Sequence, residues 1–406
     1  MRIAYICADP GVPVFGQKGC SIHVQEILRS LLKLGHQVTL FAIRLGDHPP
    51  EDLAQIPVYR LPPIPKGEQS MREKVALAVN PDLQLELELA GSFDLIYERY
   101  SLWSFSGMEY ARAKGIPGIL EVNAPLIEEQ AKHRGLIYCK SAEGVAQRVF
   151  TAASKIVAVS APIKNYLTNY VSPEKIHVIP NGVNCERFAS PLLPTFPTNS
   201  ETFVVGFVGS LKPWHGLSIL TDAFTRLHQR VSQSRLLIVG DGPEREKIEA
   251  DLLARNLQSA VHFTGAVTPN QIPGLLASMN VAVAPYPERT DQRSRLRPGV
   301  RLQVGRDFYF SPLKVYEYMA AGLPVVTSSI GQLTDLIEDG INGILCPPGD
   351  AEALANALEL LWRSPELAMS LGNLARHTVL QNHTWDAIAH EILTLANVNQ
   401  LVGGFR

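Results

Sequence analysis

The chain has 406 residues, of which 46% are hydrophobic and 19% charged, and its formal net charge at pH 7 is −2. This length favours two domains, each with enough apolar residues for its own core. The near-neutral charge argues against a protein that binds nucleic acid.

The cysteines and the apolar runs indicate the cellular compartment of the protein. Five cysteines are scattered along the chain without a CxxC pair, which argues against a zinc site and favours a reducing cytosol. The first apolar stretch, residues 3–8, is too short for a signal peptide, and no run approaches the roughly 18 apolar residues of a membrane span. We therefore expect a cytoplasmic protein and leave open a peripheral contact with a membrane.

In the first half of the chain, short apolar segments alternate with amphipathic helical segments. Residues 2–8 predict a strand, and residues 21–35 predict a helix with one apolar face that ends at Gly35. Further strands are predicted over residues 38–43, 94–100, 117–122, 155–160 and 175–180. This alternation is typical of a parallel sheet that is covered by helices on both faces.

The composition changes at residues 188–201, where three prolines and several serines and threonines predict a linker. Beyond it the alternation returns, with strands predicted over residues 203–209, 235–240, 261–265, 281–286 and 324–329. We therefore expect two α/β domains, residues 1–187 and 202–384. Open parallel sheets bind ligands beyond the carboxyl ends of their strands, so the strand-to-helix loops are the places to search.

Residues 308–326 place a cation where a helix begins. Ser311 is a natural N-cap, and Pro312 fits the first helical position. Lys314 therefore lies in the first turn, where the helix already carries about half a positive charge. A bound phosphate would account for this lysine, whereas a solvated pair with Glu317 is the simpler alternative.

The loop of residues 7–21 is rich in glycine, including Gly19, and precedes a helix. Glycines let a backbone approach a phosphate closely. The loop lacks the G-x-G-x-x-G pattern, so it does not specifically indicate a dinucleotide site, and a nicotinamide dehydrogenase is disfavoured. An ordinary long loop explains these residues equally well.

Two loops of the second half carry further polar groups. Residues 207–216 follow a strand and contain Lys212 and His215, and in residues 239–244 two glycines flank Asp241. With Lys314, these loops suggest a site for a diphosphate and its nucleoside. The chain has no Asp-x-Asp triplet, so a metal that bridges carboxylates to the diphosphate is not indicated, and protein cations would carry the charge.

The ordered set of motifs resembles family 4 of the retaining glycosyltransferases, which have the GT-B fold of two Rossmann-like domains that face each other across a cleft. The resemblance spans nearly the whole chain, through the Gly19 loop before SIHVQEIL, then VIPNGVNCERF, FVGSLKPWHG, IVGDGPER, VHFTGAV and FSPLKVYEYMAAGLPVV. It also implies that the helix of residues 385–406 crosses back to the first domain.

The resemblance implies a nucleotide-diphosphate sugar as donor, held mainly by the second domain. Glu317 matches the glutamate that binds the ribose hydroxyls, and Val267 matches a position whose backbone reads the base. Asn123 stands where many members carry a histidine near the sugar, and Glu121 precedes it by two residues. The diphosphate would meet the remaining donor-site residues, Gly19, Ser210, His215, Asp241, Gly242, Ser311, Pro312 and Leu313.

The sequence departs from the family pattern at several positions. Tyr309 stands at the first glutamate of the usual Glu-x7-Glu motif, Ser210 replaces an arginine, and His215 replaces a lysine. Lys212 and Lys314 are the candidate replacements for the two cations, and with Glu121 and Asn123 they form the predicted catalytic set.

The resemblance implies sugar transfer with retention of configuration to an acceptor hydroxyl of a glycan, lipid or small molecule, without a metal ion or other cofactor. Two alternatives stay open, a sugar-nucleotide epimerase of the same architecture and a homologue that binds nucleotide without turnover. Residues 289–306 form an arginine-rich insertion, which we interpret either as a lid or anionic-acceptor contact, or as a solvated loop.

Overall fold

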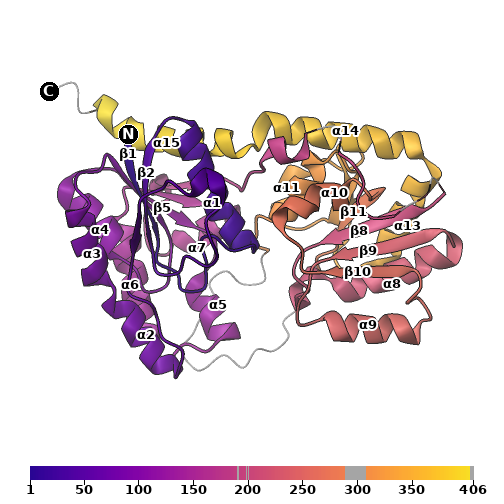
Figure 1. The fold of residues 1–406 in the computed structure, drawn as a ribbon, viewed down its shortest axis with the longest axis horizontal. Coiled ribbons are helices and arrows are strands. Elements are labelled where there is room, and N and C mark those ends of the chain that lie inside the picture. Colours follow the sequence, from indigo (N-terminus) through magenta and orange to yellow (C-terminus); the bar gives the residue numbers. More distant parts are fainter. Residues whose placement is uncertain (190–191, 198, 200, 289–307, 403–406) are drawn as a thin grey trace. The chain divides into compact units, whose positions relative to one another are not determined.

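The computed structural model describes residues 1–189, 192–197, 199, 201–288 and 308–402. The chain forms two compact units, each built on its own parallel sheet (Figure 1). Unit 1 comprises Met1–Asn181, residues 308–311 and the C-terminal helix from Trp385. Unit 2 begins at Gly182 and includes Pro312–Thr384. The arginine-rich insertion lies outside the described residues.

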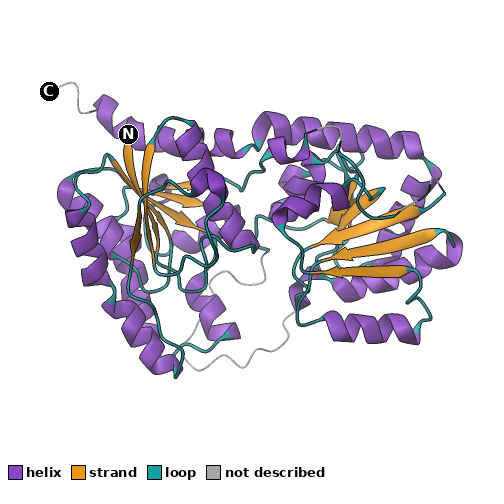
Figure 2. Ribbon diagram, viewed as in Figure 1, coloured by secondary structure: helices purple, strands orange, loops and turns teal. Residues whose placement is uncertain are grey.

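The described strands of unit 1 form a seven-stranded sheet in the order β3-β2-β1-β4-β5-β6-β7, all parallel. The strands are β1 Arg2–Cys7, β2 Gln37–Ala42, β3 Val58–Arg60, β4 Leu95–Arg99, β5 Gly118–Val122, β6 Lys155–Ala158 and β7 Ile176–Val178. The helices are α1 Gly19–Lys33, α2 Gln69–Ala78, α3 Asn80–Leu89, α4 Ser106–Lys114, α5 Leu126–His133, α6 Cys139–Ala152, α7 Ala161–Leu167 and α15 Trp385–Val402. Helices flank the sheet on both sides, as the continuous burial of its central strands requires (Figure 2).

Unit 2 repeats this plan with the order β10-β9-β8-β11-β12-β13, again all parallel. Its strands are β8 Phe203–Val208, β9 Ser234–Val239, β10 Val261–Gly265, β11 Val281–Ala284, β12 Val325–Ser328 and β13 Ile344–Cys346. Its helices are α8 Leu217–Arg230, α9 Arg245–Ala254, α10 Ile272–Leu276, α11 Leu313–Ala320, α12 Leu333–Leu336, α13 Ala351–Arg363 and α14 Pro365–Asn382. The chain order of the first four strands is therefore the same in both units.

The segment expected to be a linker is part of unit 2. Phe188 is fully buried, and the backbone N–H groups of Thr195 and Phe196 each donate to Ser278 Oγ at 3.0 Å. The boundary between the units falls after Asn181 rather than after residue 187. Composition predicted a linker here, and it cannot reveal hydrogen bonds to residues far away in the sequence.

The C-terminal helix α15 packs against α1 within unit 1. The Trp385 ring meets the His23 ring edge to face, with centroids 4.9 Å apart. Asp386 accepts a hydrogen bond from Ser30 Oγ at 2.9 Å and forms an ion pair with Lys33 at 2.7 Å. These contacts fix the start of the helix that the sequence resemblance assigned to the first domain. In the part of the chain that the structure describes, no helix combines the length and apolar character needed to cross a membrane.

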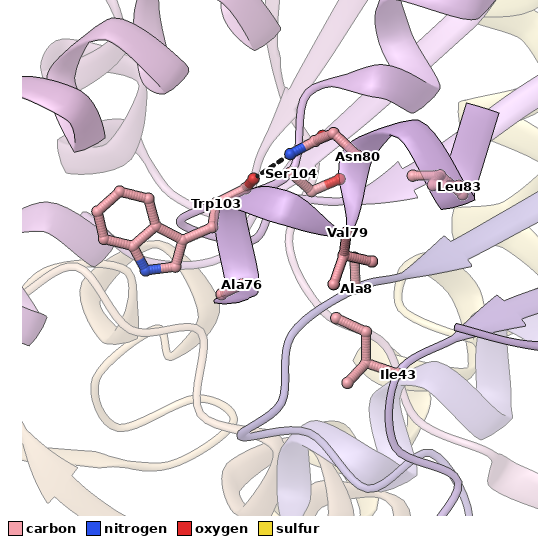
Figure 3. A pocket seen from close by; sticks show the side chains of 8 residues that line it. All are labelled: Ala8, Ile43, Ala76, Val79, Asn80, Leu83, Trp103 and Ser104. Atoms are coloured by element: carbon pink, nitrogen blue, oxygen red, sulfur yellow. Dashed lines mark hydrogen bonds between the residues drawn. The ribbon is translucent and has the colours of Figure 1, made fainter. Parts of the chain in front are cut away.

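A small cavity lies in unit 1 beside the carboxyl ends of β1, β2 and β4. It is lined by Ala8, Ile43, Ala76, Val79, Asn80, Leu83, Trp103 and Ser104 (Figure 3). Its volume of about 10 Å³ is room for a single water molecule. The Asn80 amide donates to the carbonyl oxygens of Leu77 and Trp103, both at 2.8 Å, so its polar groups serve the fold. We regard this cavity as a packing feature of the domain.

Candidate functional site

The strand order of unit 2 reverses direction between β8 and β11. The chain leaves β8 toward β9 on one side and β11 toward β12 on the other, so the two connections diverge. In doubly wound sheets this switch point is where ligands bind. The loop 209–216 follows β8, and Tyr286 follows β11.

Glycines lock these loops together by backbone contact. Gly216 has φ +67°, and a Cβ atom on it would lie 1.5 Å from the carbonyl oxygen of Pro285. A Cβ atom on Gly240, which has φ +128°, would lie 2.2 Å from the carbonyl oxygen of Gly209. Because a side chain fits at neither position, the sequence keeps glycine where the loops after β8, β9 and β11 touch.

The ammonium group of Lys314 lies buried at this switch point. Its Nζ is 4.1 Å from the ring centroid of Phe207 and 5.8 Å from that of Tyr286. It has no hydrogen-bond partner among the described residues. Burial lowers the pKa of Lys314 to about 7. The Lys314 ammonium is thus not solvated, and the attraction of Glu317, which raises this pKa, is weaker than the effect of burial.

The start of α11 differs from the predicted cap. The N-cap residue is Pro312, and Leu313 and Lys314 are the first helical residues. Ser311 belongs to unit 1, where its Oγ accepts a hydrogen bond from the Asn181 N–H at 2.9 Å. The expected Ser311 cap is not formed because this tertiary partner holds the hydroxyl. The lysine still occupies the first helical turn, next to N–H groups that no side chain caps.

His215 is a neutral group in this site. Its Nδ1 lies 2.5 Å from the carbonyl oxygen of Ser210. Burial, and then the nearby Lys314, lower its pKa to about 3. A neutral ring next to a carbonyl must donate from Nδ1, which leaves Nε2 as an acceptor. Positive charge here comes from Lys314 and from Lys212, whose Nζ is 5.9 Å from the Trp214 ring centroid.

The loop after β9 joins the loop after β8 through its backbone. The Leu211 N–H donates to the carbonyl oxygen of Asp241 at 3.0 Å. The Asp241 carboxylate accepts from the Gly242 N–H at 2.7 Å and pairs with Arg245 at 3.3 Å. The predicted residues of these two loops, Ser210, Lys212, His215, Asp241 and Gly242, are thus brought together in one unit.

Glu317 is held by an arginine that sequence reasoning left without a role. Arg187 Nη1 lies 3.4 Å from Glu317 Oε1, and Arg187 Nη2 donates to the carbonyl oxygen of Pro269 at 2.7 Å. Pro269 closely follows Val267, the predicted base-reading position. Arg187 therefore links the predicted ribose and base positions. Its place in VIPNGVNCERF was the one sequence signal that pointed to it.

In unit 1, Glu121 lies inside a buried polar cluster. Its Oε1 is 2.5 Å from His23 Nε2 and 3.8 Å from Arg99 Nη1, and its Oε2 accepts from the Tyr97 hydroxyl at 2.7 Å. Only 2% of Glu121 is exposed. Burial raises the pKa of Glu121, but the surrounding donors, His23 most of all, outweigh it and lower this pKa to about 2. Glu121 was predicted as a catalytic residue, and the structure buries it among these partners.

Asn123 follows β5 and is partly exposed. Its Nδ2 donates to Glu121 Oε1 at 2.8 Å. Gly19, the other predicted unit 1 residue, is exposed as the first residue of α1. His23, Tyr97 and Arg99 come from elements distant in sequence, so no local motif indicated their meeting with Glu121.

Tyr309 lies in unit 1 and serves as an anchor there. Its ring is buried in the core of that unit, and its hydroxyl donates to Glu129 Oε1 at 2.5 Å. Its carbonyl oxygen accepts from Ser160 Oγ at 2.8 Å. The residue at the first glutamate position of the family motif therefore has a structural role in this chain.

The sequences of known proteins identify the family. The family described as Glycosyltransferase Family 4 matches residues 18–187, and the one described as Glycosyl transferases group 1 matches residues 202–364. The chain belongs to glycosyltransferase family 4. It is similar to the MMP alpha-(1->4)-mannosyltransferase of Mycolicibacterium hassiacum, with 25% identity over 97% of each chain.

Solved structures agree on the fold of this glycosyltransferase. The sucrose-phosphate synthase of Thermosynechococcus elongatus superposes with a TM-score of 0.72 at 22% identity, over 99% of each chain. HepE of Anabaena, in complex with UDP, has a TM-score of 0.69 at 19% identity, over 98% of this chain and 100% of its own. The fold is GT-B. No group of three or more His, Cys, Asp or Glu side chains that could hold a metal occurs within the described ranges.

Proposed function

We propose that this glycosyltransferase transfers a sugar from a nucleotide-diphosphate sugar to an acceptor hydroxyl, with retention of configuration and without a metal ion. The observation that carries the proposal is the buried ammonium of Lys314, which has no partner among the described residues. A buried cation without a partner is unfavourable unless a ligand supplies the opposite charge.

The chemistry of a leaving diphosphate fits this part of unit 2. Negative charge grows on the diphosphate as the bond to the sugar breaks. Lys314 and the uncapped N-terminus of α11 would stabilise that charge at the switch point. The Leu313 N–H and the backbone dipole at Pro312 would contribute contacts there, and Lys212 a second charge.

The nucleoside half of the donor would use the neighbouring loops. Glu317 would accept hydrogen bonds from the ribose hydroxyls, and the backbone at Val267 would contact the base. Arg187 would hold both in place. The capture of UDP by HepE, a protein of the same fold, supports a nucleoside diphosphate as the ligand class.

Retention follows if the acceptor hydroxyl attacks from the face that the diphosphate leaves. Catalysis would then consist of positioning and charge stabilisation, and no side chain would form a covalent intermediate. Gly19 and Asn123 would belong to the substrate-facing edge of unit 1. We place the reaction in the cytoplasm, in keeping with five free cysteines. If the acceptor is a lipid, the protein would make a peripheral contact with the membrane surface.

A thermal-shift screen tests the proposal directly. The purified protein is heated with UDP, GDP, ADP and their glucose or mannose conjugates, each with and without EDTA. A ligand that binds the folded state raises the midpoint of unfolding. We expect a shift for one nucleotide series that EDTA leaves unchanged. A shift that EDTA abolishes would contradict the metal-free site, and no shift with any nucleotide would contradict the donor.

A product assay separates transfer from the alternatives. Conversion of the donor into a different nucleotide-sugar in the absence of an acceptor would indicate an epimerase. The anomeric configuration of the transferred sugar, read by NMR from its coupling constant, tests retention.

A further inference from the structure

We propose that Glu121 is a positioning residue that fixes the Asn123 amide with its nitrogen inward, so that Asn123 Oδ1 accepts a hydrogen bond from a substrate hydroxyl. The inference rests on the proposed function for the substrate, but its geometry stands on unit 1 alone. It assigns a role to a buried charge that the transfer mechanism itself does not use.

The polarity of the Asn123 amide follows from the charge of its neighbour. Glu121 is a carboxylate and can only accept hydrogen bonds. The side-chain atom of Asn123 that lies 2.8 Å from Glu121 Oε1 must therefore be the NH2 group. The amide oxygen is then turned away from the cluster. Among the described residues, no donor reaches it, and Asn123 is partly exposed.

The carboxylate is itself held from several elements of unit 1. His23 on α1 lies 2.5 Å from Oε1, and Tyr97 on β4 donates to Oε2 at 2.7 Å. The His23 ring in turn packs against Trp385, the first residue of α15. Since each partner is fixed by a different secondary structure element, Glu121 has little freedom to rotate. Asn123 is thus attached to a rigid support.

An outward amide oxygen selects its partner by chemistry. It accepts from a hydroxyl, and it repels a phosphate oxygen or a carboxylate, which can only accept. The two hydroxyls available in the proposed reaction are those of the donor sugar and that of the acceptor. Either would be oriented by Asn123 without proton transfer to it.

Two substitutions at Glu121 with two matched controls test this role. Glu121→Gln keeps an acceptor oxygen for Asn123, whereas Glu121→Leu removes it at similar size. Glu98, on the adjacent strand β4, is also fully buried, and its carboxylate accepts from Ser104 at 2.5 Å. Burial raises the pKa of Glu98 to about 7, so Glu98→Gln and Glu98→Leu replace a buried but less charged carboxyl group of the same sheet without touching Asn123.

The first readout needs no substrate. With ¹⁵N-labelled asparagine, the side-chain NH2 protons of Asn123 should exchange slowly in the wild type and in Glu98→Leu, and quickly in Glu121→Leu. Glu121→Gln should retain most of the protection. Fast exchange in the wild type would overturn the proposed amide orientation, even if the protein is an active transferase.

The second readout uses UDP-glucose and UDP, and, in parallel, GDP-mannose and GDP. We expect Glu121→Leu to keep the affinity for the nucleoside diphosphate. It should lose about tenfold in one of two quantities. The first is the added affinity, by which the sugar conjugate binds more tightly than the nucleoside diphosphate, and the second is the rate of nucleotide release. Loss of added affinity identifies a donor-sugar hydroxyl, and loss of rate alone identifies the attacking hydroxyl.

The controls separate a positioning role from a general loss of stability. Glu121→Gln should recover most of the activity, and both Glu98 variants should behave as the wild type. Equal losses in Glu98→Leu and Glu121→Leu would overturn the proposal. If the wild type binds no nucleotide at all, the proposed function is refuted. The hydrogen-exchange measurement would still test the orientation of the Asn123 amide, because it needs no substrate.

Discussion

Two buried charged side chains, one in each unit, have opposite kinds of surroundings. Glu121 in unit 1 is surrounded by groups that donate hydrogen bonds or carry positive charge, and its pKa falls to about 2. Lys314 in unit 2 lies against aromatic rings without a hydrogen-bond partner in the described chain, and its pKa falls to about 7. In the first shift the neighbouring groups outweigh burial, and in the second burial outweighs the attraction of Glu317.

We infer from this contrast that Glu121 supports a site and that Lys314 meets a ligand. A compensated charge is already at its most favourable in the free protein, and a further ligand gains little from it. An uncompensated charge is unfavourable until an anion arrives. We therefore expect substitutions at the two positions to affect stability and binding in opposite proportions.

The largest effect should come from Lys314→Met. Removal of the unpaired charge should stabilise the free protein by about 2–4 kcal/mol at pH 7, and it should weaken the binding of UDP or GDP at least about 100-fold. Thermal unfolding and calorimetry measure the two effects. Lys247→Met, at an exposed lysine of α9 in the same unit, is the control and should change neither.

The sign of the stability effect follows from the lysine pKa. The unfolded chain keeps the ordinary value of 10.5, whereas the folded value is about 7. The penalty is therefore full below pH 7 and fades as the pH rises from 7 to 10.5. Destabilisation by Lys314→Met, with unchanged nucleotide affinity, would show that Lys314 is a structural residue.

Glu317→Ala should weaken nucleoside diphosphate binding about 10–100-fold, because the ribose would lose a charged acceptor. The affinity for inorganic diphosphate should change less than the affinity for the nucleoside diphosphate, since the Lys314 side chain remains and loses only the attraction of Glu317, which raises its pKa. Competition of each ligand against a fluorescent nucleotide would compare them. Unchanged nucleoside diphosphate affinity would refute the ribose role of Glu317.

The affinity for the nucleotide-sugar should depend on pH through Lys314. UDP-glucose keeps its charge across this range, so above about pH 7 its Kd should rise about tenfold per pH unit as the free lysine loses its proton. Below pH 7 the Kd should be level. Lys314→Arg, which stays protonated, should remove the dependence, and a wild-type Kd that is flat to pH 9 would contradict the pKa of about 7.

Tyr309→Phe should have the smallest effect. It deletes the hydroxyl that donates to Glu129, at a cost of about 1 kcal/mol in the free energy of unfolding. Because this bond lies inside unit 1, the affinity for UDP-glucose should not change. A clear loss of affinity would show that Tyr309 replaces the family glutamate at the donor after all.

The sequence alone was sufficient to predict the alternation of strands and helices. Strands that are buried on both faces of a parallel sheet appear in the sequence as short apolar runs between amphipathic helices. It failed at the predicted linker and at the Ser311 cap, since Ser278 and Asn181, which decide these positions, are distant in sequence. Local rules placed Lys314 in a first helical turn. They could not show that the folded chain would bury it against Phe207.

The same limit applies to unit 1. The family resemblance singled out Glu121 and Asn123, and the structure joins them by a hydrogen bond. The resemblance could not show that His23 and Tyr97 reach Glu121 from other elements. Patterns of a few residues predict which polar groups share an edge of the sheet. Only the tertiary structure reveals which of these groups already have hydrogen-bond or charge partners.

The glycines where the unit 2 loops touch have a consequence for protein engineering. Since no side chain fits at Gly216 or Gly240, saturation mutagenesis of these loops should return glycine at both positions. Libraries intended to change donor preference are better directed to exposed positions of the loop after β10, such as Ala266 and Thr268. The backbone of the loops after β8 and β9 can then serve as a constant scaffold on which new nucleotide specificities are selected.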